Sequence, residues 1–496
     1  MRPILLVVKN MRIVIVGAGL VGTQLARHLV QEKHDVSIIE ANEERARHAS
    51  NRLDCLVLHD QGNSLEALEE AEIARADALV CVTDSDEVNM IICGLAASRY
   101  PRLLKIARVR NDDYVRLNRA AAGEGASPRA FKDPRILGID HFVHPDVETS
   151  RAVLSALAHG ALGNILDFAG TSYELGSINV SSGSSFDGLC LKDFRSHIQG
   201  ESLITLVERG EMSFLPTGST ILAGGDRIHI LAMEKEMDHI FRLAGRSESP
   251  LRRIGIVGGG RIGALIAEDL LEGEGSGGPE GRKNGGLFSI FKSFIPRSSH
   301  HVVIIEQDYR VCKELAARFP RALILNEDIS DESFVAEERI GELDLIITAT
   351  ANQELNMIAA IYLKSRGVKR TIAMVTGSGY ETIARQLGVD VVIPMKSVVV
   401  DSILSHLMGS GIRGIHRLGD GSVGIIEIEI GPDSPAAEKA ITEFRLSGGG
   451  LVMLVKRGGV SFIPRGDYVF QGEDKVVLIA KNGSEAELEK FFGAPR

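Results

Sequence analysis

Two repeated features predict an α/β fold that occurs twice in this chain. The apolar run Arg12–Val16 leads directly into a Gly-x-Gly-x-x-Gly motif at Gly17–Gly22, and the same arrangement returns at Arg253–Gly263. Each copy is followed by an apolar segment that ends in Ile-Ile-Glu, and then by a region of β-type alternation. A strand that opens a helix through such glycines is typical of a dinucleotide-binding βαβ unit. The predicted fold class is therefore α/β, with two Rossmann-like, doubly wound parallel-sheet domains, each followed by a small α+β domain.

Length and composition limit the possible classes of protein. A chain of 496 residues is too long for one domain, and 44% hydrophobic with 25% charged residues is typical of a soluble globular protein. The net charge of −10 argues against a nucleic-acid partner, because phosphate binding requires a basic face. The five cysteines have no metal-ligand spacing, so we expect buried thiols and no metal site. No apolar run approaches the roughly 18 residues that span a bilayer, and the first ten residues are too short for a signal peptide. We therefore expect a cytoplasmic protein.

Alternating strand and helix patterns continue through the first half. We expect helices at 20–30, 43–52, 65–71 and 88–98, and strands at 12–16, 35–40, 55–58, 77–82, 103–110 and 136–143. The amphipathic segment 146–158 leaves this body as a helix. Region 163–245 then alternates like a β domain, with strands near 203–210, 213–216 and 227–231 and a closing helix at 234–243.

The pattern restarts after residue 250. Strands are expected at 253–257, 302–306, 322–325, 343–349, 371–375 and 389–394, a helix at 396–407, and small-domain strands near 451–458, 461–464 and 475–479. We expect nucleotide-binding domains at 11–145 and 252–394, linker helices at 146–162 and 395–412, and small domains at 163–246 and 413–496.

An insertion of about 272–300 interrupts the second nucleotide-binding domain. Its second part has apolar residues at Leu287, Phe288, Ile290, Phe291, Phe294 and Ile295, with basic residues around them. Two interpretations remain open: a loop whose aromatic residues pack onto the parent domain, or an amphipathic helix that contacts a membrane surface or a membrane protein.

The first glycine motif and the strand ends after it predict a nucleotide cleft. The glycines allow a tight turn, close approach of backbone to a pyrophosphate, and close packing of helix and strand. Glu40 lies where an acid that hydrogen-bonds an adenosine ribose is expected, which favours NAD or an adenine nucleotide over NADP. The loop at Thr83 follows the fourth strand and faces the same crevice. Arg108 and Arg110 share one face of the fifth strand, where guanidinium groups suit a di- or triphosphate or, alternatively, make up a solvated strand end.

The second copy keeps the glycines and Glu306 but lacks the paired arginines, because its fifth strand ends at Met374-Val375-Thr376-Gly377. A nucleoside fits this pattern, but additional phosphates would be less well neutralised. We therefore expect the first cleft to be the stronger, regulated site.

No constellation of catalytic residues is apparent. A dehydrogenase needs a substrate domain that brings an acid or base to the nicotinamide ring. The histidines of the first small domain, His197, His229 and His239, are scattered and have no counterparts in the second. We expect no enzymatic activity and no catalytic residue.

At this point the chain resembles the TrkA family, the cytoplasmic regulatory subunits of bacterial and archaeal Trk potassium-uptake systems. The likeness spans Met11 to Phe492. It is most specific at Val82–Met90, which resembles V-T-x-x-D-E-x-N-M, and at Ile106–Tyr114, which resembles I-A-R-x-R-x-x-x-Y. The family is built from two tandem RCK units, each a TrkA-N domain followed by a TrkA-C domain. The insertion and the missing arginines are departures, and the third-strand loops only loosely resemble the family's Gly-Asp turn.

The resemblance implies two sets of cofactor-binding residues. The first set is Gly17, Ala18, Gly19, Leu20, Val21, Gly22, Glu40, Thr83, Arg108 and Arg110, and the second is Gly258, Gly260, Arg261, Ile262, Gly263 and Glu306. The implied cofactor is NAD(H), or alternatively ATP or ADP.

The resemblance also implies partners and a mechanism. The expected partner is a membrane-embedded potassium transporter of the TrkH or TrkG type, on the inner face of the plasma membrane. Dimers or tetramers would form a gating ring whose shape changes on ligand exchange. A ligand shifts such a ring only if its affinity differs between the two shapes. A soluble NAD-linked oxidoreductase and a nucleotide sensor without a membrane partner are the alternatives.

Overall fold

The computed structural model describes residues 11–111, 113–114, 136–158, 165–168, 171–198, 200–210, 212–245, 251–272, 301–331, 333–407, 416–418, 423–431, 434–444, 449–481 and 484–492. Residues 273–300 of the insertion lie outside these residues, so both interpretations of it, a packed loop or an amphipathic helix, stay predictions. The chain divides into two compact units: one contains 10–161 and 250–407, and the other contains 1–9, 162–249 and 408–496. The duplication therefore places both Rossmann-like domains in one unit and both small domains in the other.

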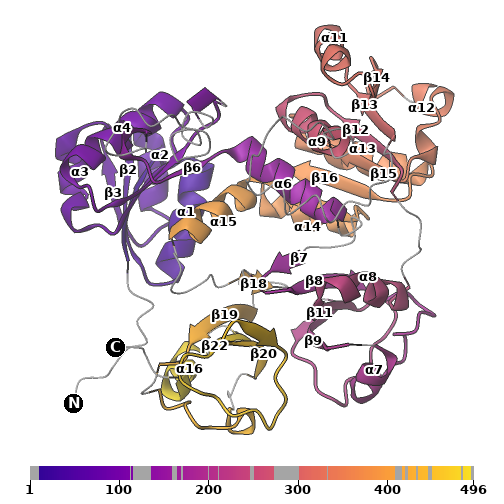
Figure 1. Cartoon of the computed structure of the whole chain (residues 1–496). Coiled ribbons are helices and arrows are strands. Elements are labelled where there is room, and N and C mark those ends of the chain that lie inside the picture. The colour runs from indigo at the N-terminus through magenta and orange to yellow at the C-terminus, as the bar shows by residue number, and fades with distance from the viewer. Residues whose placement is uncertain are drawn as a thin grey trace, which may run out of the picture. The chain divides into compact units, whose positions relative to one another are not determined.

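The first Rossmann domain is a six-stranded parallel sheet with the order β3-β2-β1-β4-β5-β6. Its strands are β1 (Arg12–Val16), β2 (Asp35–Glu40), β3 (Leu56–His59), β4 (Ala78–Cys81), β5 (Leu104–Arg108) and β6 (His141–Val143). Helices α1 (Leu20–Gln31), α2 (Glu43–Ser50), α3 (Leu65–Glu70) and α4 (Asp86–Arg99) connect them, with the 3-10 turn η1 (Ile73–Arg75) before β4. Because helices cover both faces, the central strands are near-continuous apolar runs, and residues 13–16 are all buried. Figure 1 shows this domain in indigo.

The second Rossmann domain repeats the topology with the order β14-β13-β12-β15-β16-β17. Its strands are β12 (Arg253–Val257), β13 (His301–Ile305), β14 (Leu323–Leu325), β15 (Leu345–Thr348), β16 (Thr371–Val375) and β17 (Val391–Pro394). Its helices are α9 (Arg261–Glu272), α11 (Tyr309–Arg318), α12 (Ser333–Glu337), α13 (Gln353–Ser365) and α14 (Ser378–Gln386), with the turn η3 (Ile340–Glu342). In both sheets the order reverses between the first and fourth strands, which is where ligands bind in doubly wound folds. The predicted fold class is confirmed for both copies.

One predicted strand was wrong in its extent. Residues 136–143 were expected to form a single strand, but Ile136–Gly138 is the 3-10 turn η2 and only His141–Val143 pairs with β5. Leu137 and Gly138 both have positive φ, at 49° and 65°, which breaks an extended strand. The side chain of Ile136 packs against the core of the domain, so the apolar pattern there reflects burial in a turn.

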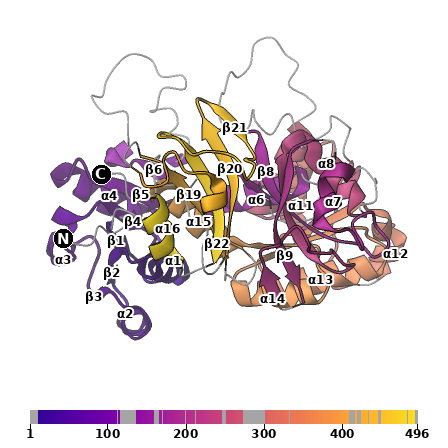
Figure 2. The same cartoon turned by 90° about the horizontal axis from the view of Figure 1, so that it is seen from below.

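Each small domain is a five-stranded antiparallel sheet, with the orders β10-β9-β11-β8-β7 and β18-β19-β22-β20-β21. The first contains β7 (Ile165–Asp167), β8 (Tyr173–Asn179), β9 (Ser202–Arg209), β10 (Met212–Phe214), β11 (Arg227–Met233), α7 (Leu191–His197) and α8 (Glu234–Leu243). The second contains β18 (His416–Leu418), β19 (Val423–Glu429), β20 (Gly450–Arg457), β21 (Val460–Phe462), β22 (Lys475–Lys481), η4 (Ile441–Glu443) and α16 (Glu485–Phe492). Figures 1 and 2 show β19, β22 and β20 side by side.

An ion pair between a partly exposed arginine and a buried aspartate recurs at the same place in both small domains. Arg209 Nε lies 2.7 Å from Asp226 Oδ1, and Arg457 Nε lies 2.6 Å from Asp474 Oδ1. Hydrogen bonds from the arginine and from a backbone N–H group keep the pKa of each aspartate below its usual value, although burial opposes this. Asp226 and Asp474 therefore make the same structural contact in the two copies.

Two helices join the Rossmann domains within their unit. Helix α6 (Pro145–Ala158) packs against α9 and α15, and α15 (Met395–Leu407) also packs against α1 of the first domain. Gln24 Nε2 of α1 donates to Ser397 Oγ of α15 at 3.1 Å. Figure 1 shows α15 beside α1. The helix that follows each sheet thus packs against the opposite domain. Among the described residues, no helix has the length and apolarity needed to cross a membrane.

A stacked histidine pair lies where α15 meets β6. The rings of His141 and His406 have centroids 4.2 Å apart and planes inclined by 15°. Burial, with the nearby positive groups His141 and Arg151, lowers the pKa of His406 to about 4, and burial also lowers the pKa of His141. Both rings are therefore neutral at pH 7.

We predict that the chain loses stability in mild acid because of this pair. Their folded-state pKa values are lowered, so the stabilisation is complete above the unfolded pKa of about 6.5 and is lost as the pH falls toward 4. For half-buried rings we expect a loss of about 1 kcal/mol between pH 6.5 and pH 5. Denaturant unfolding of wild type and His406→Phe measures this, because phenylalanine keeps the stacking and does not titrate. His48→Phe, on an exposed helix position, is the control, and an acid-induced loss of the same size in His406→Phe would contradict the assignment.

Candidate functional site: two clefts at the carboxyl ends of the sheets

The first glycine motif forms a tight turn that begins α1 beside β4. Gly17 has φ +105°, and its N–H donates to the Ile39 carbonyl at 2.8 Å. A Cβ on Gly22 would lie 1.9 Å from the Gly17 oxygen, so only glycine allows this approach of helix and strand. Gly19 is the N-cap of α1 and makes no side-chain cap, and an added Cβ there would meet nothing within 4 Å. Leu20 and Val21 occupy the first turn of the helix, where backbone N–H groups attract anions.

Glu40 connects the end of β2 to this turn. Its side chain is buried, and its two carboxylate oxygens accept from Ala18 N at 2.5 Å and Asn42 N at 2.9 Å. Glu306 is placed in the same way in the second domain, accepting from Gly259 N at 2.7 Å and Asp308 N at 2.9 Å. Both acids therefore stand at the predicted edge of their clefts. Their bonds to the glycine loops give each a structural role that does not depend on a ligand.

Asn89 holds the opposite side of the first cleft together. Its Oδ1 accepts from Thr83 N at 2.9 Å and from Thr83 Oγ1 at 2.7 Å, while Nδ2 donates to the carbonyls of Thr83 and Arg108 at 3.1 and 2.9 Å. One fully buried amide thus joins the ends of β4 and β5 to the first turn of α4. Asn356 makes the corresponding four bonds to Thr350 and Met374 in the second domain. Asn89 was not among the site residues predicted from the sequence, although the motif at Val82–Met90 contains it.

Arg108 is a buried cation at the carboxyl end of β5. Its side chain is 8% exposed, and the acceptors nearest to Nη1 are the Val82 carbonyl at 3.5 Å and Asp84 Oδ1 at 3.6 Å. Burial, followed by the charge of Arg110, lowers the pKa of Arg108. Arg110 lies two residues further on, is exposed, and has its backbone N–H bonded to Asp86 Oδ2 at 2.8 Å. The structure therefore places both predicted arginines close together at the first cleft.

Asp84 and Arg45 also belong to this cleft but were absent from the predicted set. Asp84 Oδ2 lies 3.6 Å from Nη1 of Arg45, the third residue of α2, and its other oxygen faces Arg108. The position of Asp84 directly after Thr83 was a signal for it, because a residue beyond a strand end faces the crevice. Arg45 gave no such signal, since exposed arginines are common on helices.

The second cleft has the same backbone without these charges. Since Asn89 bonds the Arg108 carbonyl and Asn356 bonds the Met374 carbonyl, Met374 occupies the position of Arg108. By the same register Ala351 corresponds to Asp84 and Thr376 to Arg110. Gln353 replaces Asp86, with its Oε1 accepting from Thr376 N at 2.9 Å. The expected difference between the clefts is therefore one of charge, with the local architecture preserved.

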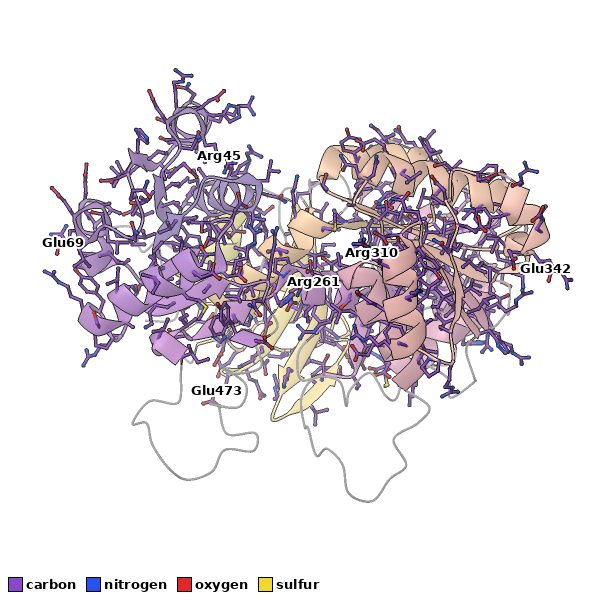
Figure 3. The ribbon with its side chains drawn as sticks, turned by 90° about the horizontal axis from the view of Figure 1, so that it is seen from above. Arg45, Glu69, Arg261, Arg310, Glu342 and Glu473 are labelled. Atoms are coloured by element: carbon purple, nitrogen blue, oxygen red, sulfur yellow. The ribbon has the colours of Figure 1, made fainter. Side chains whose placement is uncertain are left out.

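Arg261 extends from the second glycine motif toward the first domain. Its Nη2 donates to the Arg110 carbonyl at 2.6 Å, and its Nε lies 3.2 Å from Asp146 Oδ2 at the start of α6. Nη2 is also 3.4 Å from His144 Nε2. Figure 3 labels Arg261 between the two Rossmann domains. The sequence assigned Arg261 to the second site, whereas its side chain contacts the strand end beside the first. Gly258, with φ +99°, and Gly263 reproduce the turn of the first copy, and Ile262 follows Arg261 in the first turn of α9.

Within the residues that the structure describes, no group of three His, Cys, Asp or Glu side chains is arranged to hold a metal ion. The five cysteines have free thiols, of which Cys81, Cys93 and Cys312 are buried. Burial is the main cause that raises the pKa of Cys81 and of Cys312 above the usual value of a thiol. Sγ of Cys93 lies 3.6 Å from Sγ of Cys81, and both side chains form part of the core of the first domain.

Comparison with known proteins agrees with this arrangement. The TrkA-N domain model matches residues 13–127 and 292–394, and the TrkA-C domain model matches residues 175–245 and 425–493. The Trk system potassium uptake protein TrkA of Halomonas elongata is 26% identical over 487 residues, covering 97% of this chain and 98% of that protein. The TrkA homolog 1 of Methanosarcina mazei is 27% identical over 488 residues, covering 97% and 100%.

Two solved structures share the fold across the chain. The GsuK RCK domain has a TM-score of 0.54 at 16% identity and covers 99% of this chain and 97% of that one. The GsuK channel bound to NAD has a TM-score of 0.54 at 17% identity and covers 99% of this chain and 80% of that one. The order of two TrkA-N and two TrkA-C domains along the chain is the predicted organisation.

We predict that Gly19→Ala and Gly22→Ala separate ligand binding from folding. The Cβ added at position 22 collides with the Gly17 carbonyl, so we expect a loss of about 2 kcal/mol of stability. The Cβ added at position 19 meets no protein atom within 4 Å but stands where backbone must approach a pyrophosphate. Gly19→Ala should therefore melt like wild type and show a weakened nucleotide-induced rise in Tm. An apo Tm lowered equally by both changes would contradict this division of roles.

Proposed function

Because the chain belongs to the family of proteins built from tandem TrkA-N and TrkA-C domains, we propose that it is a regulatory subunit of a potassium uptake system. In this proposal it lies in the cytoplasm, peripheral to the inner face of the plasma membrane, and acts on a membrane-embedded potassium transporter of the TrkH or TrkG type. The names of the relatives that match over nearly the whole chain support the system. Catalysis is not part of this function, since the family is regulatory.

The first cleft carries the proposal for the ligand. It combines a helix N-terminus without a side-chain cap, a buried acid at the second strand end, and Arg108, a buried cation whose nearest acceptors are 3.5 and 3.6 Å away. A buried cation is costly unless an anion pairs with it at short range. A nucleotide with a di- or triphosphate meets this need, so we propose NAD(H), with ATP or ADP as the alternative. That a channel of the same fold is described as bound to NAD supports the ligand class.

Ligand exchange at this cleft is proposed to control transport through the linker helices. Helix α6 begins at Pro145 directly after β6, and it packs against α9 and α15 of the second domain. A ligand that changes the end of β5 therefore acts on residues in contact with the second domain. Such a ligand gates transport only if it binds one arrangement more tightly than the other.

Self-association is proposed to build the ring on which the gating depends. The first domain exposes Ile91 and Leu137, with exposed fractions of 51% and 45%, around a shallow apolar hollow lined also by Leu95. The second exposes Ile358 and Leu387 at 64% and 56%. Exposed apolar groups on the equivalent helices α4 and α13, and just before the last strand of each sheet, are suited to contacts between chains. A dimer or tetramer is the expected assembly, and its size in solution tests it.

We predict that changing the first cleft toward the second abolishes the response to nucleotides. The triple variant Asp84→Ala/Arg108→Met/Arg110→Thr installs the residues that the second copy carries. Removing a buried charge should leave the apo Tm equal or higher. Wild type should gain about 2.7 kcal/mol at a hundredfold excess of nucleotide over Kd, and the variant should gain little. Thermal unfolding with NADH, NAD, ATP and ADP measures both. No shift with any nucleotide in wild type would refute nucleotide regulation, and failure to co-purify with a potassium transporter would refute the partner.

We predict that Arg261 contributes to binding at the first cleft although it belongs to the second glycine motif. Arg261→Leu, which installs the residue of the first copy at this position, removes a cation hydrogen-bonded to the Arg110 carbonyl. We expect about fivefold weaker binding of ATP, equivalent to about 1 kcal/mol. Arg310→Leu is the charge-matched control, because Arg310 is exposed on α11 of the same domain (Figure 3). Equal effects of the two changes would mean that only net charge matters.

A further inference from the structure

Asp84 occupies an unusual position between two arginines of the first cleft. Its side chain is 75% exposed, and its two oxygens lie 3.6 Å from Arg45 Nη1 and 3.6 Å from Arg108 Nη1. Charge-assisted N–H···O bonds are normally about 2.7–2.9 Å long. The carboxylate thus lies between both cations without a short bond to either. Figure 3 labels Arg45 on the first domain.

The weakness of this contact matters because Arg108 is buried. A guanidinium that is 8% exposed has lost most of its hydration, and its contacts with Asp84 and the Val82 carbonyl are long. Asp84 neutralises part of the charge while remaining in solvent itself. A phosphate at the same place would carry more charge and offer several oxygens at short range. Asp84 therefore acts as a weak counter-ion of Arg108, and a more highly charged anion can displace it.

The second cleft shows what happens to these charges when the arginine is absent. Met374 replaces Arg108, Ala351 replaces Asp84, and Val311 stands at the third position of α11, as Arg45 does in α2. All three charges are missing together, while the Asn356 network and the Glu306 contacts persist. The fold of the cleft does not require the trio. The acid is present only where the arginines are, which links its role to them.

We propose that Asp84 is a built-in competitor for the phosphate-binding position of Arg108, so that it sets how strongly the first cleft discriminates nucleotides by their phosphate charge. The inference rests on the proposed nucleotide binding at this cleft. In the free protein the carboxylate of Asp84 lies between the guanidinium groups of Arg45 and Arg108. When a polyphosphate binds, the side chain of Asp84 rotates away from the arginines toward solvent. The ligand must therefore overcome the attraction of Asp84 to the arginines and the repulsion between Asp84 and the phosphates. Nucleosides without phosphate do not meet this competition.

The test measures the affinities of adenosine, AMP, ADP and ATP for the full chain by calorimetric titration without divalent cations. The variants are Asp84→Asn, which keeps the shape, and Asp84→Ala, which installs the residue of the second copy. Both should bind ATP about tenfold more tightly than wild type, ADP less so, and adenosine equally. The gain should shrink at high salt, because Asp84 is exposed. The gain in affinity should increase with the number of phosphates on the nucleotide.

Glu69→Gln is the matched control. Glu69 is an acid of the same domain, 2.8 Å from Arg99 and well away from Arg45 (Figure 3), and its loss changes the net charge by the same amount. Equal tightening in this control would overturn the proposal, because a general charge effect would then suffice. Weaker ATP binding in Asp84→Asn would overturn it by making Asp84 a group that holds the ligand. Unchanged affinity in both Asp84 variants, with nucleotides still bound, would overturn it while leaving the proposed function standing. No binding in any protein would overturn both.

Discussion

The buried amide of Asn89 is the contact on which the first cleft depends. Its four hydrogen bonds hold the ends of β4 and β5 against the first turn of α4, and so fix where Thr83 and Arg108 stand. A fully buried side-chain amide is stable only when its donors and acceptors are paired. Here every bond goes to a residue of the cleft rim. The same four bonds around Asn356 give the second cleft the same frame. The backbone arrangement of the cleft is therefore independent of the charged side chains that it carries.

That independence explains how two copies of one fold can carry different charges at the same place. The glycine turns and the strand-end acids Glu40 and Glu306 have the same hydrogen bonds in both. Those acids bond to backbone N–H groups of the loops, so retaining them stabilises the turn whether or not a nucleoside binds. Arg108 gives no such benefit, because burial of its charge is unfavourable in the free protein. Its counterpart, Met374, packs in the core of the second domain. Asp84, which is exposed and 3.6 Å away, offsets only part of the cost of burying this charge.

Much of this arrangement was predictable from the sequence, and the remainder depended on contacts between distant residues. The parallel strands are apolar runs bounded by turn residues, so their number and their sequence along the chain followed from the local pattern. Glycines in the sequence indicated the turns between them. The 3-10 turn at Ile136 has the same apolar pattern as a strand, and only the backbone angles of Leu137 and Gly138 distinguish it. Asp84 and Arg45 are 39 residues apart in the sequence, so no periodic pattern could predict that their side chains lie close together. The direction of Arg261 is likewise set by the packing of α9 against α6, a tertiary contact between domains.

The two clefts are physically connected at the end of β5. The Arg110 carbonyl accepts from Arg261 of the second glycine motif, while the Arg110 N–H is held by Asp86 of the first. One peptide segment is thus bonded on one side to the loop of its own cleft and on the other to the helix that begins the second cleft. Under the proposed nucleotide binding, a phosphate that draws Arg108 or Arg110 toward itself acts directly on this segment. Because Arg261 also faces Asp146 at the start of α6, the same displacement reaches a linker helix without a long chain of intermediates. Coupling between sites requires an element with two arrangements that ligand binding biases, and Arg110, just after the end of β5, is bonded to residues of both copies.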